Sequence, residues 1–198
     1  MREAGNLERR SIGVTSVGGS NDGTSVAVLP SAARFSLRIA SDEAAKRRTV
    51  IGLRIDLPIN TCSAEGEKLS ARLGPDEWLL IAPERDSSCL GQNIAAELAG
   101  AFFSLVDVGH RNVGFRVVGA HAAEIVNGGC PLDLDDAVFP AGSATRSLLG
   151  KAEIVLVRPG VEKAYRVECW RSFAPYVYGF LRDVAREFDA GKPVRPGR

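Results

Sequence analysis

The stretch NVGFRVVGAHAAEIVNGGCPLDLDDAVFPAGSATRSLLGKAEIVLVRP, residues 112–159, contains each kind of element that we expect in the fold. It opens with β-branched and aromatic residues typical of a strand, and apolar residues then recur at helical spacing over residues 122–126. We expect Asn127-Gly128-Gly129 to end that helix, because glycine tolerates positive φ. After an acidic loop, two β-rich runs flank a tight turn at Gly150-Lys151. The stretch therefore predicts the order strand, helix, strand, strand.

A similar pattern occurs 76 positions upstream. Residues 73–83 and 149–159 share the pattern L-G-x-x-E-x-x-L-x-x-P, and each is preceded by a strand that contains phenylalanine, Phe35 or Phe115. The surrounding elements are also expected in the same order. We interpret the chain as two diverged copies of one β-α-β-β unit, in which the hairpins containing Trp78 and Ile154 are equivalent.

Other elements follow from the same periodicities. Strands are predicted at residues 33–39, 68–73, 77–81, 102–108 and 164–170, with a polar loop at 58–67. Helices are predicted after Ser41, after Ser87 or Ser88, and after Ser172, with these serines as N-caps. The last helix has the clearest apolar stripe, made by Tyr176, Val177, Phe180, Leu181, Val184 and Phe188, and its centre is expected in the core.

Composition and charge limit the functional classes. The 198-residue chain has 45% hydrophobic residues and a net charge of +1, so no electrostatic field favours nucleic acid. We expect a flexible arm at 1–25, one compact domain at 26–190 with pseudo-repeats at about 30–108 and 110–190, and a flexible tail at 191–198. No signal peptide or membrane span is evident, and the cysteines are widely spaced. A cytoplasmic protein with reduced thiols and no membrane partner is expected.

Few residues suggest catalysis or metal binding. His110 and His121 are the only histidines, and no nucleophile elbow is present, so we expect His110 to be a surface turn residue rather than a base. The loop with Asp133, Asp135 and Asp136 lacks the glutamate of a calcium loop, which favours a solvated acidic loop over a metal site. Cys130 is expected to be structural unless Arg111 or Arg146 lies close to it.

Two further sets of residues leave alternatives open. Glu77 and Glu153 occupy matching places in the two hairpins, where paired carboxylates would serve acid–base chemistry, but solvated hairpin ends are the simpler interpretation. Arg171 and Ser172 precede the aromatic helix, where the guanidinium would bind a carboxylate or a partner, or simply mark the helix start.

Several motifs together resemble the gamma subunit of heterotetrameric sarcosine oxidase. The resemblance covers roughly residues 30–188, and Gly109 stands where serine is expected before a histidine-arginine pair, so no hydroxyl acts at that turn. The motifs are Gly129-Cys130-Pro131-Leu132-Asp133-Leu134-Asp135 with Phe139-Pro140, Leu73–Leu80, Asp107–Arg111, Thr145-Arg146, Lys151–Leu156 and Trp170–Tyr176.

The resemblance implies a fold related to the folate-binding aminomethyltransferases. We expect an α+β protein of two tandem ferredoxin-like β-α-β-β-α-β halves. The implied complex oxidatively demethylates sarcosine to glycine, transfers the one-carbon unit to tetrahydrofolate and produces hydrogen peroxide. FAD, FMN, NAD and zinc would be held by the alpha, beta and delta subunits, with no catalytic residue, metal or cofactor in this chain.

The resulting hypothesis is a non-catalytic assembly subunit. Trp170, Arg171, Phe173 and Tyr176 are the candidate interface residues, because aromatics and arginine dominate interface energies. The alternatives are a free-standing folate-binding module, similar to those of tRNA modification or iron–sulfur maintenance, and an independent aminomethyl-transferring enzyme. A basic, aromatic-lined pocket would favour the folate hypotheses, and a broad apolar patch would favour the subunit.

Overall fold

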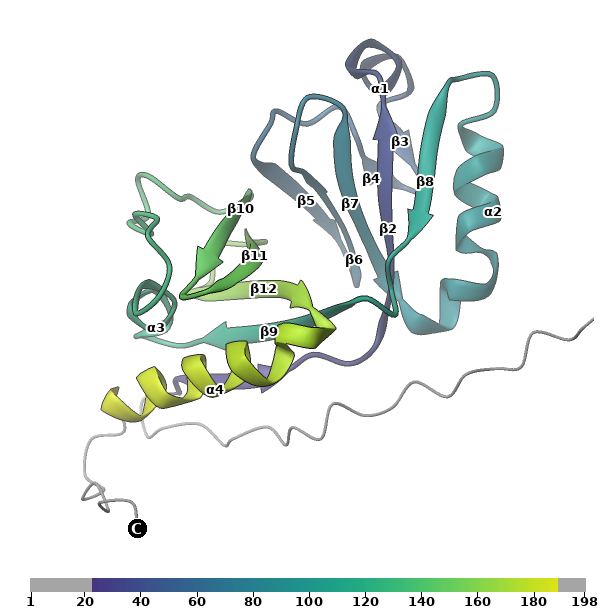
Figure 1. Ribbon diagram of the computed structural model, residues 1–198. Coiled ribbons are helices and arrows are strands. Elements are labelled where there is room, and N and C mark those ends of the chain that lie inside the picture. Colours follow the sequence, from purple (N-terminus) through teal and green to yellow (C-terminus); the bar gives the residue numbers. More distant parts are fainter. Residues whose placement is uncertain (1–22, 189–198) are drawn as a thin grey trace, which may run out of the picture.

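The computed structural model describes residues 23–188, which form an antiparallel sheet covered by helices (Figure 1). The strands are β1 (Ser25–Val28), β2 (Ala32–Ile39), β3 (Thr49–Val50), β4 (Leu53–Arg54), β5 (Thr61–Glu65), β6 (Lys68–Arg72), β7 (Glu77–Pro83), β8 (Phe103–Asp107), β9 (Asn112–Val118), β10 (Ser143–Leu149), β11 (Ala152–Arg158) and β12 (Ala164–Trp170). The helices are α1 (Ser41–Arg47), α2 (Ser87–Glu97), α3 (Ala122–Asn127) and α4 (Ala174–Ala185), with 3₁₀ turns at Glu84–Asp86, Arg171–Phe173 and Arg186–Phe188.

Ten strands form one sheet in the order β1-β9-β12-β11-β10-β5-β6-β7-β2-β8, and β3 and β4 form a separate small hairpin. The sheet narrows between β10 and β5, where Ser143 opposite Thr61 is the single residue pair in register. This junction divides the sheet into two halves. The first half contains β5, β6, β7, β2 and β8, and the second half contains β10, β11, β12, β9 and β1.

The two halves have the same strand order but not the predicted one. Reading outward from the junction, β5-β6-β7-β2-β8 corresponds to β10-β11-β12-β9-β1. In each half, three strands of the large sheet rather than two lie between the two helices, and the first half has the β3-β4 hairpin there as well, so the ferredoxin-like order β-α-β-β-α-β is not confirmed. The outermost strand of the second half is β1, which precedes the first half in the sequence and pairs with β9.

The predicted equivalence of the Trp78 and Ile154 hairpins is wrong, because the strands that contain these residues are displaced by one position in the strand order of their halves. Trp78 lies on β7, which pairs with the central strand β2, whereas Ile154 lies on β11, which pairs with β10 and β12. The strand that occupies the place of β7 in the second half is β12, which pairs with β9. The shared pattern of residues therefore does not mark equivalent positions.

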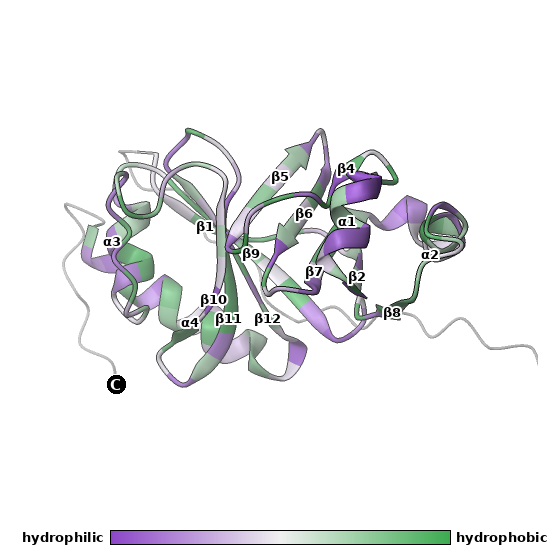
Figure 2. Ribbon diagram, turned by 90° about the horizontal axis from the view of Figure 1, so that it is seen from above, coloured by the Kyte–Doolittle hydropathy of each residue, from purple (hydrophilic) through white to green (hydrophobic). Residues whose placement is uncertain are grey.

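Helices cover the outer faces of both halves, and the inner faces of the half-sheets face each other. Figure 2 shows α2 at one end of the molecule and α3 and α4 toward the other, with α1 over the ends of the strands of the first half. The alternation predicted for residues 33–39 is confirmed, since Phe35, Leu37 and Ile39 are buried in the cluster that includes Leu90 and Ile94 of α2. The polar side chains between them therefore lie on the inner face.

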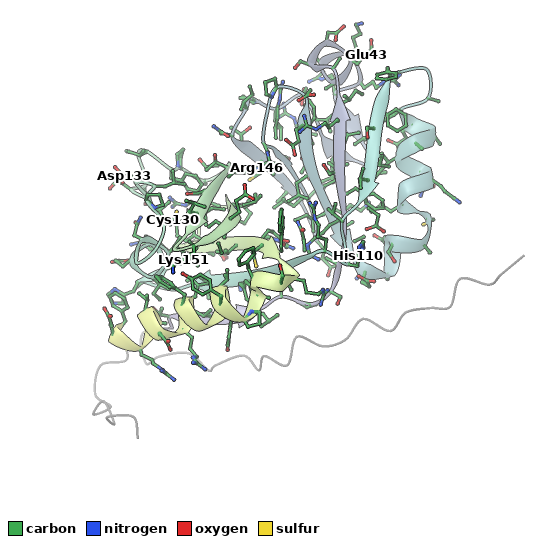
Figure 3. The ribbon with its side chains drawn as sticks, in the orientation of Figure 1. Glu43, His110, Cys130, Asp133, Arg146 and Lys151 are labelled. Carbon is green, nitrogen blue, oxygen red and sulfur yellow. The ribbon has the colours of Figure 1, made fainter. Side chains whose placement is uncertain are left out.

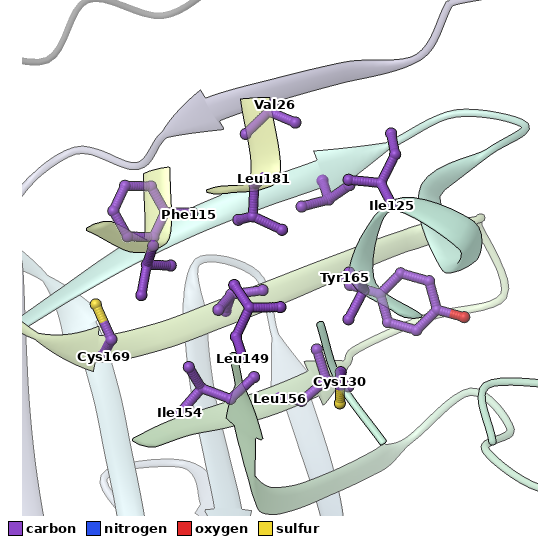
Figure 4. Close-up of a cluster of buried hydrophobic side chains, with 14 of the residues drawn as sticks. Val26, Phe115, Ile125, Cys130, Leu149, Ile154, Leu156, Tyr165, Cys169 and Leu181 are labelled. Carbon is purple, nitrogen blue, oxygen red and sulfur yellow. The ribbon is translucent and has the colours of Figure 1, made fainter. Parts of the chain in front are cut away.

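The second half has its own core beneath α3 and α4 (Figure 4). Tyr165, Val167 and Cys169 of β12 are buried there, as their alternation predicts. Leu181 of α4 is fully buried, but Phe180 is only partly buried, which corrects its predicted place in the core. The buried face of α4 instead includes Tyr178.

A third apolar cluster joins the inner faces of the two halves. Leu79 and Ile81 of β7 lie in this cluster with Ala144 of β10 and Val157 of β11. Its buried members also include Ala32, Cys62 and Ala71, so small side chains make up part of the contact between the two halves. Further from the junction the inner faces carry charged side chains, and these form the site described next.

Several local predictions are corrected. Residues 58–67 are not only a loop, because Thr61–Glu65 forms β5 and turns back into β6 through Gly66, whose φ is 59°. None of the predicted serines caps a helix through its side chain: Ser41 and Ser87 are the first helical residues, and Ser172 lies in a 3₁₀ turn.

The glycines after α3 are explained by close packing and not, as predicted, by a positive φ. Gly128 has an ordinary φ of −54°, and Gly129 is not among the positive-φ residues either. A Cβ atom at Gly128 would lie 2.9 Å from Val184, and one at Gly129 would lie 2.6 Å from Phe180. Glycine is required here because α4 passes too close for a side chain.

The predicted terminal segments fall largely outside the described residues. The expected tail at 191–198 lies wholly outside them, and of the expected arm at 1–25 only the last three residues are described, with Ser25 beginning β1. Across residues 23–188, no helix has both the length and the apolar character needed to cross a membrane.

Candidate functional site in the cleft between the half-sheets

A cleft of about 400 Å³ opens between the inner faces of the two halves. Its charged and aromatic lining includes Arg38, Glu77, Arg111, Arg146, Glu153 and Trp170. Figure 3 shows Arg146 between the two half-sheets, with Cys130 and Lys151 on the far side of the second half. We call this cavity the inter-sheet cleft. Glu77 and Glu153 both line it, although the hairpins that carry them are not equivalent.

Glu77 is held in an ion-pair network rather than solvated. Its carboxylate accepts a hydrogen bond of 2.9 Å from Arg146 Nη1 and one of 3.1 Å from Arg38 Nη2, and its side chain is 12% exposed. The Arg146 hydrogen bond is the main reason why the pKa of Glu77 lies below its ordinary value. A carboxylate held ionised in this way is poorly suited to donate a proton at neutral pH.

A fully buried ion pair forms the floor of the cleft and joins the two halves. Arg34 of β2 donates to both carboxylate oxygens of Glu168 of β12, at 2.7 Å from Nε and 3.2 Å from Nη2, and Arg166 donates to the same carboxylate at 2.7 Å. Burial would raise the pKa of Glu168, but the charges and hydrogen bonds of Arg166 and Arg34 outweigh it, so the pKa is lowered. Gly114 is required beside this group, because a Cβ atom there would lie 2.5 Å from Glu168.

The four candidate interface residues lie together where β12 passes into α4. Trp170 is 45% exposed, and its ring centroid is 6.4 Å from that of Phe173, which is also exposed. Arg171 donates from Nε to the carbonyl of His110 at 2.8 Å, and the exposed Tyr176 accepts from the Lys151 amide at 3.1 Å. We call the exposed rings of Trp170, Phe173 and Tyr176 the aromatic rim. Trp170 also lines the inter-sheet cleft, so the rim and the cleft are continuous.

The remaining single-residue candidates lie elsewhere. His110 is exposed in the turn between β8 and β9 (Figure 3), and its backbone carbonyl, which accepts from Arg171, is part of that turn. Cys130 is buried in the core of the second half, 3.4 Å from the Ser147 hydroxyl. Successive side chains on β10 alternate between faces, so Arg146 points away from Cys130.

The acidic loop has structural partners. Asp133 and Asp135 accept hydrogen bonds from backbone amides two residues ahead, as turn-forming aspartates do. Asp136 lies 2.7 Å from the guanidinium of Arg158, which is almost fully buried. Among residues 23–188, no group of three or more His, Cys, Asp or Glu side chains is arranged to hold a metal ion.

Three ionisable side chains of the cleft are each stabilised in one protonation state at neutral pH. Glu77 and Glu168 are ion-paired, and burial raises the pKa of the Cys169 thiol to about 12, so this thiol stays protonated at neutral pH. The sequence patterns alone did not identify Arg34 and Glu168 as residues of the site. The sequence did contain an indication of them, namely charged residues at alternate positions opposite the apolar face of a strand. These are Arg34 and Arg38 on β2, and Arg166 and Glu168 on β12.

Comparisons with known proteins identify the family. The profile of the sarcosine oxidase, gamma subunit family matches residues 39–187. The chain belongs to this family. Among curated relatives, the sarcosine oxidase subunit gamma of Corynebacterium sp. (strain P-1) is 31% identical over 126 residues, covering 62% of this chain and 58% of the relative. The subunit gamma of an Arthrobacter species is 30% identical over 116 residues, covering 59% of this chain and 56% of the relative. The matched part therefore spans less than two thirds of either relative.

Solved structures share the fold. This chain is similar to a chain of the heterotetrameric sarcosine oxidase from Corynebacterium sp. U-96, with a TM-score of 0.75, 22% identity, and coverage of 91% of this chain and 92% of that one. It is also similar to aminomethyltransferase T of the glycine cleavage system from Bartonella henselae, with a TM-score of 0.61, 12% identity, and coverage of 79% and 44%. The predicted relation to the aminomethyltransferase fold is confirmed at this level, as a mixed α/β chain with a curled antiparallel sheet.

Proposed function

We propose that this member of the gamma family is a non-catalytic assembly subunit of a heterotetrameric sarcosine oxidase. Its partners would be alpha, beta and delta subunits in the cytoplasm. The complex would oxidise sarcosine to glycine, pass the one-carbon unit to tetrahydrofolate and release hydrogen peroxide. The flavins, NAD and zinc would be held by the other subunits.

The observation that carries the proposal is the aromatic rim beside an ion-paired cleft. Trp170, Phe173 and Tyr176 are each at least 36% exposed, although aromatic side chains of this size are usually covered. Arg111 and Arg171 stand next to them, and this mixture of aromatics and arginine is typical of the centres of protein interfaces. The ion-paired carboxylates of the cleft, with pKa values below their ordinary range, support a binding role.

The proposal is tested by omission. Genes for the four proposed subunits are co-expressed with and without the gene for this chain, and sarcosine-dependent peroxide production and subunit recovery are measured. We expect the complete set to be active, the set without this chain to be poorly assembled, and the purified chain alone to bind no flavin and produce no peroxide. Sarcosine turnover by the isolated chain would contradict the non-catalytic role. Full assembly and activity without the chain would contradict the assembly role.

A free-standing folate-binding module is the second candidate. The inter-sheet cleft contains arginines and Trp170, as such a pocket would, and the chain shares a fold with an aminomethyltransferase. Against it, Arg38 and Arg146 are already paired with Glu77. Titration of the isolated chain with tetrahydrofolate, followed by tryptophan fluorescence, separates the two candidates. Saturable micromolar binding would favour the module, and no binding would favour the subunit.

A further inference from the structure

Arg111 stands out in the inter-sheet cleft because no carboxylate of the described residues pairs with it. Its Nε donates to Asn112 Oδ1 at 3.1 Å, and no described residue accepts a hydrogen bond from its two terminal nitrogens. No carboxylate of residues 23–188 forms an ion pair with it, whereas Arg34, Arg38, Arg146 and Arg166 each pair with a glutamate. Arg111 therefore presents two free guanidinium nitrogens at an exposed position.

The orientation of Arg111 is set by its neighbours. Its guanidinium carbon lies 5.6 Å from the centroid of the Trp170 ring, and buried Asn112 holds Nε from the other side. A guanidinium that is stacked on a ring and anchored at Nε loses little conformational freedom when it binds a carboxylate. The remaining edge, with both terminal nitrogens, matches the two oxygens of a carboxylate.

The surroundings favour a protein segment over a small free ligand. Of the charged side chains that line the inter-sheet cleft, Arg38, Glu77, Arg146 and Glu168 already form ion pairs among the described residues, so a small polar ligand would find few unpaired groups there beside Arg111. Two apolar side chains of the lining, Trp170 and Val106 of β8, are exposed, and the exposed Phe173 lies next to Trp170. An occupant that used Arg111 and these groups together would have to extend out of the cleft across the aromatic rim.

We propose that Arg111 and the aromatic rim dock an extended segment of a partner subunit, whose side-chain or C-terminal carboxylate pairs with Arg111 and whose adjacent apolar side chain covers Trp170. This inference rests on the proposed function and adds the chemistry of the partner to it. The positive charge of Arg111, for which residues 23–188 offer no carboxylate partner, selects an acidic residue. The exposed rings of Trp170 and Phe173 select an apolar neighbour of that residue.

The test compares matched variants in the complex. Arg111→Gln and Trp170→Ala are each co-expressed with the partner subunits, beside Arg85→Gln as a control, because Arg85 is an exposed arginine paired with Glu67 away from the cleft. Dissociation constants for the assembled remainder of the complex are measured by biolayer interferometry at low and high salt. Thermal unfolding of each isolated variant shows that the fold is intact.

We expect Arg111→Gln and Trp170→Ala to weaken association by roughly 30-fold or more, and Arg85→Gln to change it by less than about threefold. The salt dependence of association should be smaller for Arg111→Gln than for the wild type. If the wild type fails to associate with the partners at all, the proposed function itself is wrong. If the wild type associates and both cleft variants bind as tightly as the control, the function stands and this inference is overturned.

A cross-link identifies the carboxylate directly. Arg111→Lys in the complex is treated with a carbodiimide, which joins an amine to a carboxylate in contact with it, and the product is digested and analysed by mass spectrometry. We expect a link from position 111 to an aspartate, a glutamate or a C-terminus of a partner subunit that the wild-type complex lacks. Saturable binding of sarcosine or acetate to the isolated wild type but not to Arg111→Gln, without a cross-link to a partner, would instead assign the site to a free carboxylate.

Discussion

The replacement Glu168→Ala tests whether the buried ion pair holds the two halves together. Glu168 is inaccessible to solvent and is the acceptor for Arg34, whose side chain is 2% exposed, and for Arg166. Without the carboxylate, Nε and Nη2 of Arg34 lose their acceptors, and only the hydrogen bond from Nη1 to the Ala32 carbonyl remains. Removing one partner of a buried ion pair costs about 3–5 kcal/mol.

That loss is large against a typical unfolding free energy of about 5–15 kcal/mol. With an m-value of about 2 kcal/mol per M, the urea midpoint should fall by about 2 M. The assay is urea unfolding followed by tryptophan fluorescence and circular dichroism. Glu162→Gln is the matched control, because its pair with Arg116 also involves the second half of the sheet but is exposed, and its loss should cost less than about 1 kcal/mol.

A double replacement separates charge from packing. Arg34→Met with Glu168→Leu removes the two fully buried charges and keeps most of the volume, while Arg166, whose side chain is 19% exposed, can still reach water, so the double variant should recover most of the stability lost in Glu168→Ala. The reasoning would be refuted if Glu168→Ala cost no more than the Glu162→Gln control. It would also be refuted if the double variant were as unstable as the single one, because the defect would then not be the unpaired arginine.

Three further outcomes are expected. The pKa values of Glu77 and Glu168 are lowered, so their ion pairs stabilise the fold fully above the ordinary glutamate pKa of 4.5. This stabilisation is lost as the pH falls toward the lower folded-state pKa values. Between pH 7 and pH 3, the unfolding free energy measured in urea should therefore fall less for Glu77→Gln than for the wild type. Leu181→Ala should lower the unfolding free energy by about 2–5 kcal/mol and Phe180→Ala by less, since Phe180 is only partly buried; equal losses in denaturant unfolding would contradict this difference. Arg48→Gly should raise stability by about 1 kcal/mol, or roughly 2–4 °C in thermal unfolding, because Arg48 has a φ of 66° at the end of α1; an unchanged or lower midpoint would show that this backbone is not strained.

Local patterns were sufficient for much of the secondary structure. The alternation at Phe35, Leu37 and Ile39 and at Tyr165, Val167 and Cys169 correctly predicted buried faces, because period-two burial follows from strand geometry. The turn at Gly150-Lys151 was also correct, and Gly150 has the positive φ that the turn requires. The strand at Thr61–Glu65 was missed because its polar composition is ordinary for a loop, although its pairing with β6 and β10 makes it the junction of the sheet.

Long-range relations were not visible in one sequence. The pairing of β1 with β9 joins segments about 90 residues apart, so nothing local indicated that the N-terminal strand completes the second half. The resemblance between residues 73–83 and 149–159 was misleading because similar hairpins recur one strand out of register. At the site, Glu77 and Arg146 were each noted, but the hydrogen bonds between them depend on the packing of the two halves.

The central claim is that this chain is one subunit of a larger sarcosine-oxidising assembly. The most direct test is native mass spectrometry of the complex that forms when this chain is co-expressed with the proposed partner subunits, one of which carries an affinity tag. The account predicts a single complex that contains one copy of this chain and dissociates into intact subunits on activation. Recovery of the tagged subunit in an active complex that lacks this chain would contradict the account.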